Sequence, residues 1–211
     1  MTKGRVRMGR GEMSSGEKQQ SIREQQKLMT QERLLDAAVR VFLARGYSEA
    51  TTDDIVAEAG VGRATFYLHF KSKLEVMRSL IRVVERQNES IIDEFVACGS
   101  PTREFLESWL RRFIGHWIEN GDRFLVGFQA LASEPELYRE IDVGIRLATD
   151  ALCRMMKSRQ EMQIEEVQLR ADLLVGALQQ ACRKLVSNPQ RYSVDLAIRV
   201  LTDIWASNLG I

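Results

Sequence analysis

The stretch Thr51–Lys73, TTDDIVAEAGVGRATFYLHFKSK, decides the fold of this chain. Its apolar spacing predicts two short helices joined by a tight turn at residues 60–62, which read Gly-Val-Gly. In the second helix Phe66 and Phe70 stand at positions i and i+4, so both are expected to point inward. The residues expected on its outward side are Arg63, Ala64, Tyr67 and Lys71. A helix-turn-helix with Arg, Tyr and Lys on its second helix is suited to a DNA major groove.

The outward residues are expected to make two kinds of contact with DNA, to bases and to phosphates. Arg63, at the start of the second helix, can form two hydrogen bonds with a guanine, and Ala64 and Leu68 can touch a thymine methyl. The residues suited to phosphates are Thr51, Thr52, Tyr67, His69 and Lys73. The alternative is a structural hairpin whose polar residues only face water. The combination of turn glycine, inward aromatics and outward cations favours DNA binding.

Composition favours an all-α protein. The chain has 211 residues, 45 % of them hydrophobic and only 3 of them proline, which allows a small domain joined to a larger one. We find no period-two pattern that would predict a strand. No apolar run approaches the roughly 18 residues that cross a bilayer, and the charged N-terminus is not a secretion signal. We therefore expect a cytoplasmic protein with no membrane partner.

Enzyme chemistry finds little support in the sequence. The two histidines, His69 and His116, fall in different expected domains, and the three cysteines show no metal-ligand spacing. Phosphate-binding glycine loops and nucleophile elbows are missing as well. We expect reduced thiols, no metal, no cofactor and no catalytic residue.

Charge is distributed unevenly along the chain. Residues 1–80 carry 14 Lys+Arg against 10 Asp+Glu, a net charge of +4, and the remainder carries 16 against 19, a net charge of −3. Such a basic end can meet phosphate. Residues 1–28 are expected to form a flexible basic tail, either solvated or inserted as an arm into a minor groove, with partial helix as an alternative for the stretch from Glu17 to Met29. Its basic residues are Lys3, Arg5, Arg7 and Arg10 among its first ten.

Helix signals divide the remaining chain into two expected domains, at residues 29–75 and 76–211. The first helix is predicted to begin at a Thr30 cap and to end at Gly46. Thr51 or Thr52 then caps the second helix of the small domain. The six longer helices that follow are expected at residues 74–96, 102–119, 122–132, 135–160, 165–186 and 193–209.

Roughly residues 30 to 78 resemble the DNA-binding domain of TetR-family transcriptional regulators. The residues that carry the resemblance are Phe42, Gly46, Thr51, Ile55, Ala59-Gly60-Val61, Thr65-Phe66-Tyr67, His69-Phe70 and Ser72-Lys73. By position, the resemblance implies that Arg63, Ala64 and Thr65 lie nearest the bases. It implies backbone contacts for Thr51, Thr52, Tyr67, His69 and Lys73. Gly62 and the pair Arg63-Ala64 depart from the family pattern, so no operator sequence is implied.

The same resemblance implies a homodimer with a small-molecule effector bound in the larger domain. Apolar stripes on the last two helices are then expected to pair with their two-fold copies, although packing on the chain's own core is the alternative. The interface candidates are Leu173, Gly176, Ala177, Ala181, Val200, Ile204 and Trp205. The candidates for an effector pocket, which are ordinary core residues in the alternative, are Trp109, Phe113, His116, Trp117, Phe124, Phe128 and Met155.

The sequence thus favours a DNA-binding transcriptional regulator whose partners are double-stranded DNA, a second copy of itself and an unidentified small molecule. A repressor that binds a palindromic operator is the expected form, with an activator still open. The helix after Lys73 is the expected lever, because it begins at the DNA face and runs into the effector domain. A helical interaction protein that has lost DNA binding and a small enzyme are the competing hypotheses.

Overall fold

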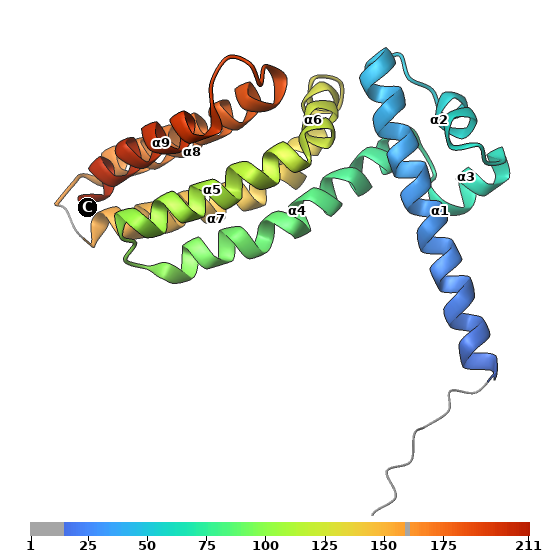
Figure 1. Cartoon of the computed structure of the whole chain (residues 1–211), viewed down its shortest axis with the longest axis horizontal. Coiled ribbons are helices and arrows are strands. Elements are labelled where there is room, and N and C mark those ends of the chain that lie inside the picture. The colour runs from blue at the N-terminus through green and yellow to red at the C-terminus, as the bar shows by residue number, and fades with distance from the viewer. Residues whose placement is uncertain (1–14, 159–160) are drawn as a thin grey trace, which may run out of the picture.

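The computed structural model describes residues 15–158 and 161–211, and within these ranges all regular structure is helical (Figure 1). The order of elements is α1 (Ser15–Arg45), α2 (Thr52–Ala59), α3 (Arg63–His69), α4 (Lys73–Cys98), α5 (Arg103–Glu119), α6 (Gly121–Ser133), the 3-10 turn η1 (Pro135–Leu137), α7 (Tyr138–Lys157), α8 (Ile164–Ser187) and α9 (Val194–Leu209). The predicted all-α fold is confirmed, and the helix order follows the sequence signals.

The first helix begins much earlier than predicted. α1 starts at Ser15, and Thr30 lies in its interior, where the hydroxyl donates to the Gln26 carbonyl at 2.8 Å. The predicted Thr30 cap is therefore wrong, and residues 15–28 belong to a helix and not to a tail. This part of α1 extends beyond α2 and α3 in Figure 1. The basic residues Lys3, Arg5, Arg7 and Arg10 lie outside the described residues.

Buried residues form two clusters joined by α4 and α6. The smaller cluster contains Phe42, Phe66 and Phe70 from the N-terminal helices, and α6 contributes Val126 and Ala130 to it. The larger cluster lies among α4, α5, α7, α8 and α9. Figure 1 shows α4 running from the N-terminal helices along the larger bundle. A shift of α4 or α6 would therefore be felt in both clusters.

None of the described helices is long and apolar enough to cross a membrane.

Candidate functional site

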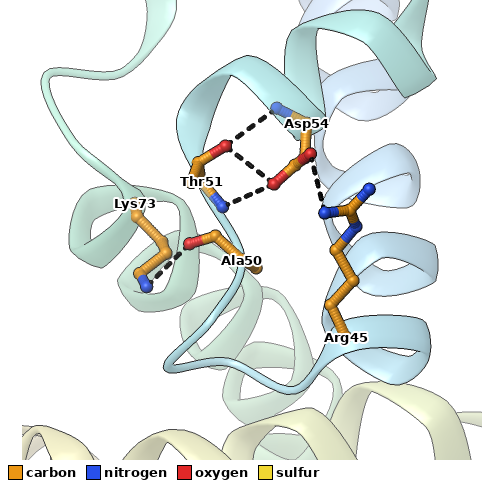
Figure 2. A network of polar contacts seen from close by, with 5 residues as sticks. All are labelled: Arg45, Ala50, Thr51, Asp54 and Lys73. Atoms are coloured by element: carbon orange, nitrogen blue, oxygen red, sulfur yellow. Dashed lines mark hydrogen bonds and ion pairs between the residues drawn. The ribbon is translucent and has the colours of Figure 1, made fainter.

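The N-terminus of α2 is fixed by a reciprocal pair of hydrogen bonds (Figure 2). The Thr51 hydroxyl accepts from the Asp54 amide at 3.2 Å, and the Asp54 carboxylate accepts from the Thr51 amide at 3.0 Å. The Thr51 hydroxyl also donates to that carboxylate at 2.7 Å. These bonds, together with the charge of Arg45, lower the pKa of Asp54. The predicted cap is confirmed at Thr51, but its hydroxyl proton is already used and is not free for a phosphate.

Lys73 holds the segment that leads into α2. Its ammonium donates to the backbone carbonyls of Tyr47, Ser48 and Ala50 at 2.7, 3.0 and 2.8 Å. It also lies 4.6 Å from the centre of the Tyr47 ring. An ammonium has three protons, and here each has a carbonyl acceptor. Lys73 therefore positions α2 in this structure, which differs from the phosphate contact predicted for it.

The turn between α2 and α3 requires glycine at its first position. Gly60 has a φ of 60°, in the left-handed region, and a Cβ there would lie 2.9 Å from Nη2 of Arg33. That Arg33 nitrogen donates to the Gly60 carbonyl at 3.3 Å and ties the turn to α1. Gly62 precedes α3 without a side-chain cap, as the sequence predicted. The turn therefore sets the direction of α3 through backbone conformation.

The short helix α3 separates buried from exposed side chains. Phe66 and the following Phe70 are buried, as predicted. Thr65 is half-buried, as is Thr52 on α2. The side chains that face solvent from α3 are Arg63, Ala64, Tyr67 and Leu68, with Tyr67 49 % exposed and Leu68 78 % exposed. The exposed face of α3 thus presents a guanidinium and a phenol hydroxyl beside two apolar side chains.

Arg63 is oriented by an acid on the neighbouring helix. Its Nε lies 3.4 Å from Oδ1 of Asp53 on α2, and both side chains are well exposed. An exposed pair of this kind is weak, on the order of 1 kcal/mol or less, so the guanidinium can exchange this partner for a nucleic acid. The sequence predicted Arg63 as the base-reading residue but missed its pairing with Asp53.

His69 ends α3 in a half-buried position. Its Nδ1 is enclosed and has no hydrogen-bond partner within the described structure. Burial, and then the charge of Lys27, lowers the pKa of the imidazole below its usual 6.5. In the DNA-free protein the neutral form of the ring is therefore favoured.

A second candidate site is an apolar cavity of about 90 Å³ in the larger cluster. Five of the seven predicted pocket residues line it, and these are Trp109, Phe113, Trp117, Phe124 and Phe128. His116 does not line it and is buried against Asn120, with 3.2 Å between His116 Nδ1 and Asn120 Nδ2. Met155 is a core residue that does not line the cavity either.

Sequence reasoning missed the polar residues of this cavity. Glu85 and Asn88 line it from α4, and Arg123 lines it from α6. Glu85 and Asn88 lie between Ile81 and Ile92 on the inward side of α4, so they interrupt an otherwise apolar row. That interruption is visible in the sequence, because a polar residue within a buried row is drawn out of solvent, as half-buried Glu85 and buried Asn88 are.

A third candidate surface is the outward side of α8 and α9, which pack against each other. Of the predicted interface residues, Leu173, Gly176, Ala177, Val200 and Ile204 are exposed and Ala181 is half-buried. Trp205 is 0 % exposed, lies with its ring centre 5.5 Å from that of Trp109 and lines the cavity, so it does not lie on this surface. Leu169 and Leu196 extend the exposed apolar face and were missed as interface candidates.

Comparison with known proteins agrees with this arrangement. Residues 34–80 match the model of the family described as bacterial regulatory proteins, tetR family. The regulator SrpR of Pseudomonas putida is 48 % identical over 52 residues, which cover 25 % of this chain and 24 % of SrpR. The transcriptional activator FasR of Mycolicibacterium smegmatis is 25 % identical over 169 residues, which cover 78 % of this chain and 76 % of FasR.

The fold of the whole chain is shared with solved structures. The transcriptional regulator FadR of Bacillus subtilis, in complex with stearoyl-CoA, superposes with a TM-score of 0.66 at 19 % identity. That likeness covers 84 % of this chain and 98 % of FadR. The chain is therefore similar to bacterial regulators of the tetR family, in sequence over residues 34–80 and in fold over most of its length. Its relatives in this family are regulators of transcription and not enzymes.

Proposed function

We propose that this protein is a repressor that binds a two-fold symmetric operator as a homodimer and is released by a small molecule in the larger domain. The observation that carries the proposal is the exposed face of α3, where Arg63, Ala64 and Tyr67 stand on a helix whose other side is buried. Arg63 reads a base, Tyr67 and the α2 N-terminus contact phosphates, and Lys73 keeps α2 in place.

The homodimer is proposed to form through the outward side of α8 and α9. The exposed apolar side chains on this side are Leu169, Leu173, Leu196, Val200 and Ile204, of which Leu173 is 64 % exposed. Gly176 and Ala177 lie on the same side and permit close approach of a second copy. Operator half-sites about 34–36 Å apart require two linked recognition helices, which a two-fold interface supplies.

We propose that ligand binding releases the operator by moving α6 as well as α4. Arg123 of α6 lines the cavity, and its Nη2 lies 3.1 Å from Oδ1 of Asp36 on α1. At the other end of α6, Glu134 lies 3.3 Å from the Tyr47 hydroxyl, beside the segment held by Lys73. A ligand that prefers one position of α6 therefore shifts the equilibrium between two placements of the N-terminal helices. The similarly folded FadR, in complex with stearoyl-CoA, is a precedent for ligand binding on this fold.

Selection of bound sequences from a random DNA pool with the purified protein tests this function. We expect an enriched site with two-fold symmetry, bound with an affinity that falls steeply with salt because phosphate contacts release counterions. Enrichment of no sequence, or binding without salt dependence, would leave the hairpin as a structural element only. Placing the site within a promoter that drives a reporter then separates repression from the activation that the name of FasR describes.

A further inference from the structure

A carboxyl group stands inside the apolar cavity without a cationic partner. Glu85 projects from α4, and its Oε2 would lie 3.3 Å from a Cβ placed on Gly144 of α7. No ion pair or hydrogen bond joins the Glu85 carboxyl to any residue whose side chain the structure describes. Glu85 is half-buried, and a carboxylate that is partly removed from water without a partner is costly, so this group requires an explanation.

The surroundings disfavour the charged form of Glu85 in the unliganded protein. Burial, and then the negative charge of Glu89 one turn further along α4, raises the pKa of Glu85 to about 7. Glu85 also lines a neighbouring pocket, together with Arg82, Arg86, Glu89 and Asp93. Arg82 donates to the Ser79 hydroxyl, and Arg86 donates to the Arg82 carbonyl, so both face other partners.

The walls around this carboxyl are aromatic. Trp117 and Phe124 stack with ring centres 3.8 Å apart, and the rings of Trp109, Phe113 and Phe128 also line the cavity. The faces of such rings carry negative charge density and attract cations. One turn along α4 from Glu85, the Asn88 amide oxygen is buried and has no donor among the described residues. This wall therefore presents acceptor oxygens from both residues.

We propose that the cavity binds hydrophobic organic cations, with Glu85 as the counter-charge and the aromatic rings as the walls. This inference rests on the proposed function, because it names the chemical class of the effector. The cation pairs with the Glu85 carboxylate, and its apolar groups pack against the aromatic rings. An anionic ligand is disfavoured because it would face Glu85, while the cationic residue of the cavity, Arg123, is paired with Asp36.

The test uses two probes of the same shape, benzyltrimethylammonium and neopentylbenzene, which differ only in the charged nitrogen. Binding to the full chain is followed by the fluorescence of Trp109, Trp117 and Trp205, all of which line the cavity. We expect the cation to bind at least about tenfold more tightly than its neutral counterpart, and Glu85→Gln to remove most of that difference. The matched control is Glu94→Gln, which removes a carboxylate from the outer side of α4, where it pairs with Arg112.

The inference is overturned if the neutral probe binds as tightly as the cation, or if Glu85→Gln and Glu94→Gln weaken cation binding equally. Tighter binding of an anionic amphiphile such as dodecanoate would also overturn it. Circular dichroism checks that both variants are folded. Binding of the ligand-free protein to its selected operator is measured separately. Retained operator binding without cation preference refutes only the ligand class, whereas loss of operator binding in the unmodified protein refutes the proposed function.

Discussion

Lys73 provides a sharp test of how the recognition helix is held. The substitution Lys73→Met keeps the length of the side chain and removes three charge-assisted hydrogen bonds to the carbonyls of Tyr47, Ser48 and Ala50. Hydrogen bonds to charged groups contribute about 1.5–3 kcal/mol each, but three bonds from one ammonium are not additive. We therefore expect the free energy of unfolding to fall by about 2–4 kcal/mol.

Thermal unfolding of the DNA-free protein, followed by circular dichroism, measures this loss. A chain of 150–250 residues loses roughly 2–4 °C per kcal/mol, so the expected decrease in Tm is about 4–15 °C. The control is Lys71→Met, because Lys71 is exposed on the same segment and its side chain makes no contact among the described residues. That variant should stay within about 0.5 kcal/mol of the parent.

A phosphate contact would give the opposite pattern. If Lys73 met DNA directly, Lys73→Met would leave Tm unchanged, and the slope of log affinity against log salt would become shallower by about 0.9. An unchanged Tm together with a shallower slope would refute the positioning role. A lower Tm together with an unchanged salt slope supports the positioning role, provided that DNA binding is measured well below the unfolding temperatures of both proteins.

Four further substitutions test the remaining sites. Leu173→Asp places a charge on the exposed side of α8, and light scattering should find a folded monomer in place of a dimer. Arg63→Ala should relax base preference at one position in each half-site by about 1–3 kcal/mol in a selection experiment, whereas Tyr67→Phe should weaken binding to all sequences alike. Because the folded pKa of Glu85, about 7, lies above its ordinary 4.5, the protein should lose stability between pH 4.5 and 7 by up to about 3 kcal/mol relative to Glu85→Gln, measured by urea unfolding.

The ends of α2 and α3 were predictable because their signals are local. Thr51 caps α2 through atoms within three residues of it, and Gly60 adopts the left-handed conformation that the Gly-Val-Gly turn requires. Ser193 caps α9 in the same way, by accepting from the Leu196 amide at 3.2 Å. Signals of this kind do not depend on the rest of the fold, so a sequence displays them directly.

The start of α1 was not predictable from its cap signal. Thr30 carries a hydroxyl that can cap a helix or bond back to the preceding turn, and here it donates to Gln26. Residues 15–29 contain no proline and many Glu, Gln, Lys and Arg, all of which favour continuation of a helix. Propensity summed over this segment outweighs a single threonine.

The assignment of Trp205 failed for a geometric reason. α9 carries two apolar rows, one with Leu201 and Trp205 and the other with Val200 and Ile204. Adjacent positions on a helix are separated by about 100°, and a wide apolar stripe does not reveal which row faces the chain's own core. In the structure Leu201 and Trp205 are buried, and the other row is exposed.

Glu85 shows where sequence reasoning could have gone further. Along α4, residues 81, 85, 88 and 92 fall on one side of the helix, and all four line the cavity. The apolar members of this row are buried, so the polar residues between them are drawn out of solvent, with Asn88 buried and Glu85 half-buried. Neither contributes to packing as an apolar residue would, and the unpaired carboxyl lowers stability above its pKa. Such a group between two isoleucines costs stability without a gain in packing, which is the observation on which the proposed cation site rests.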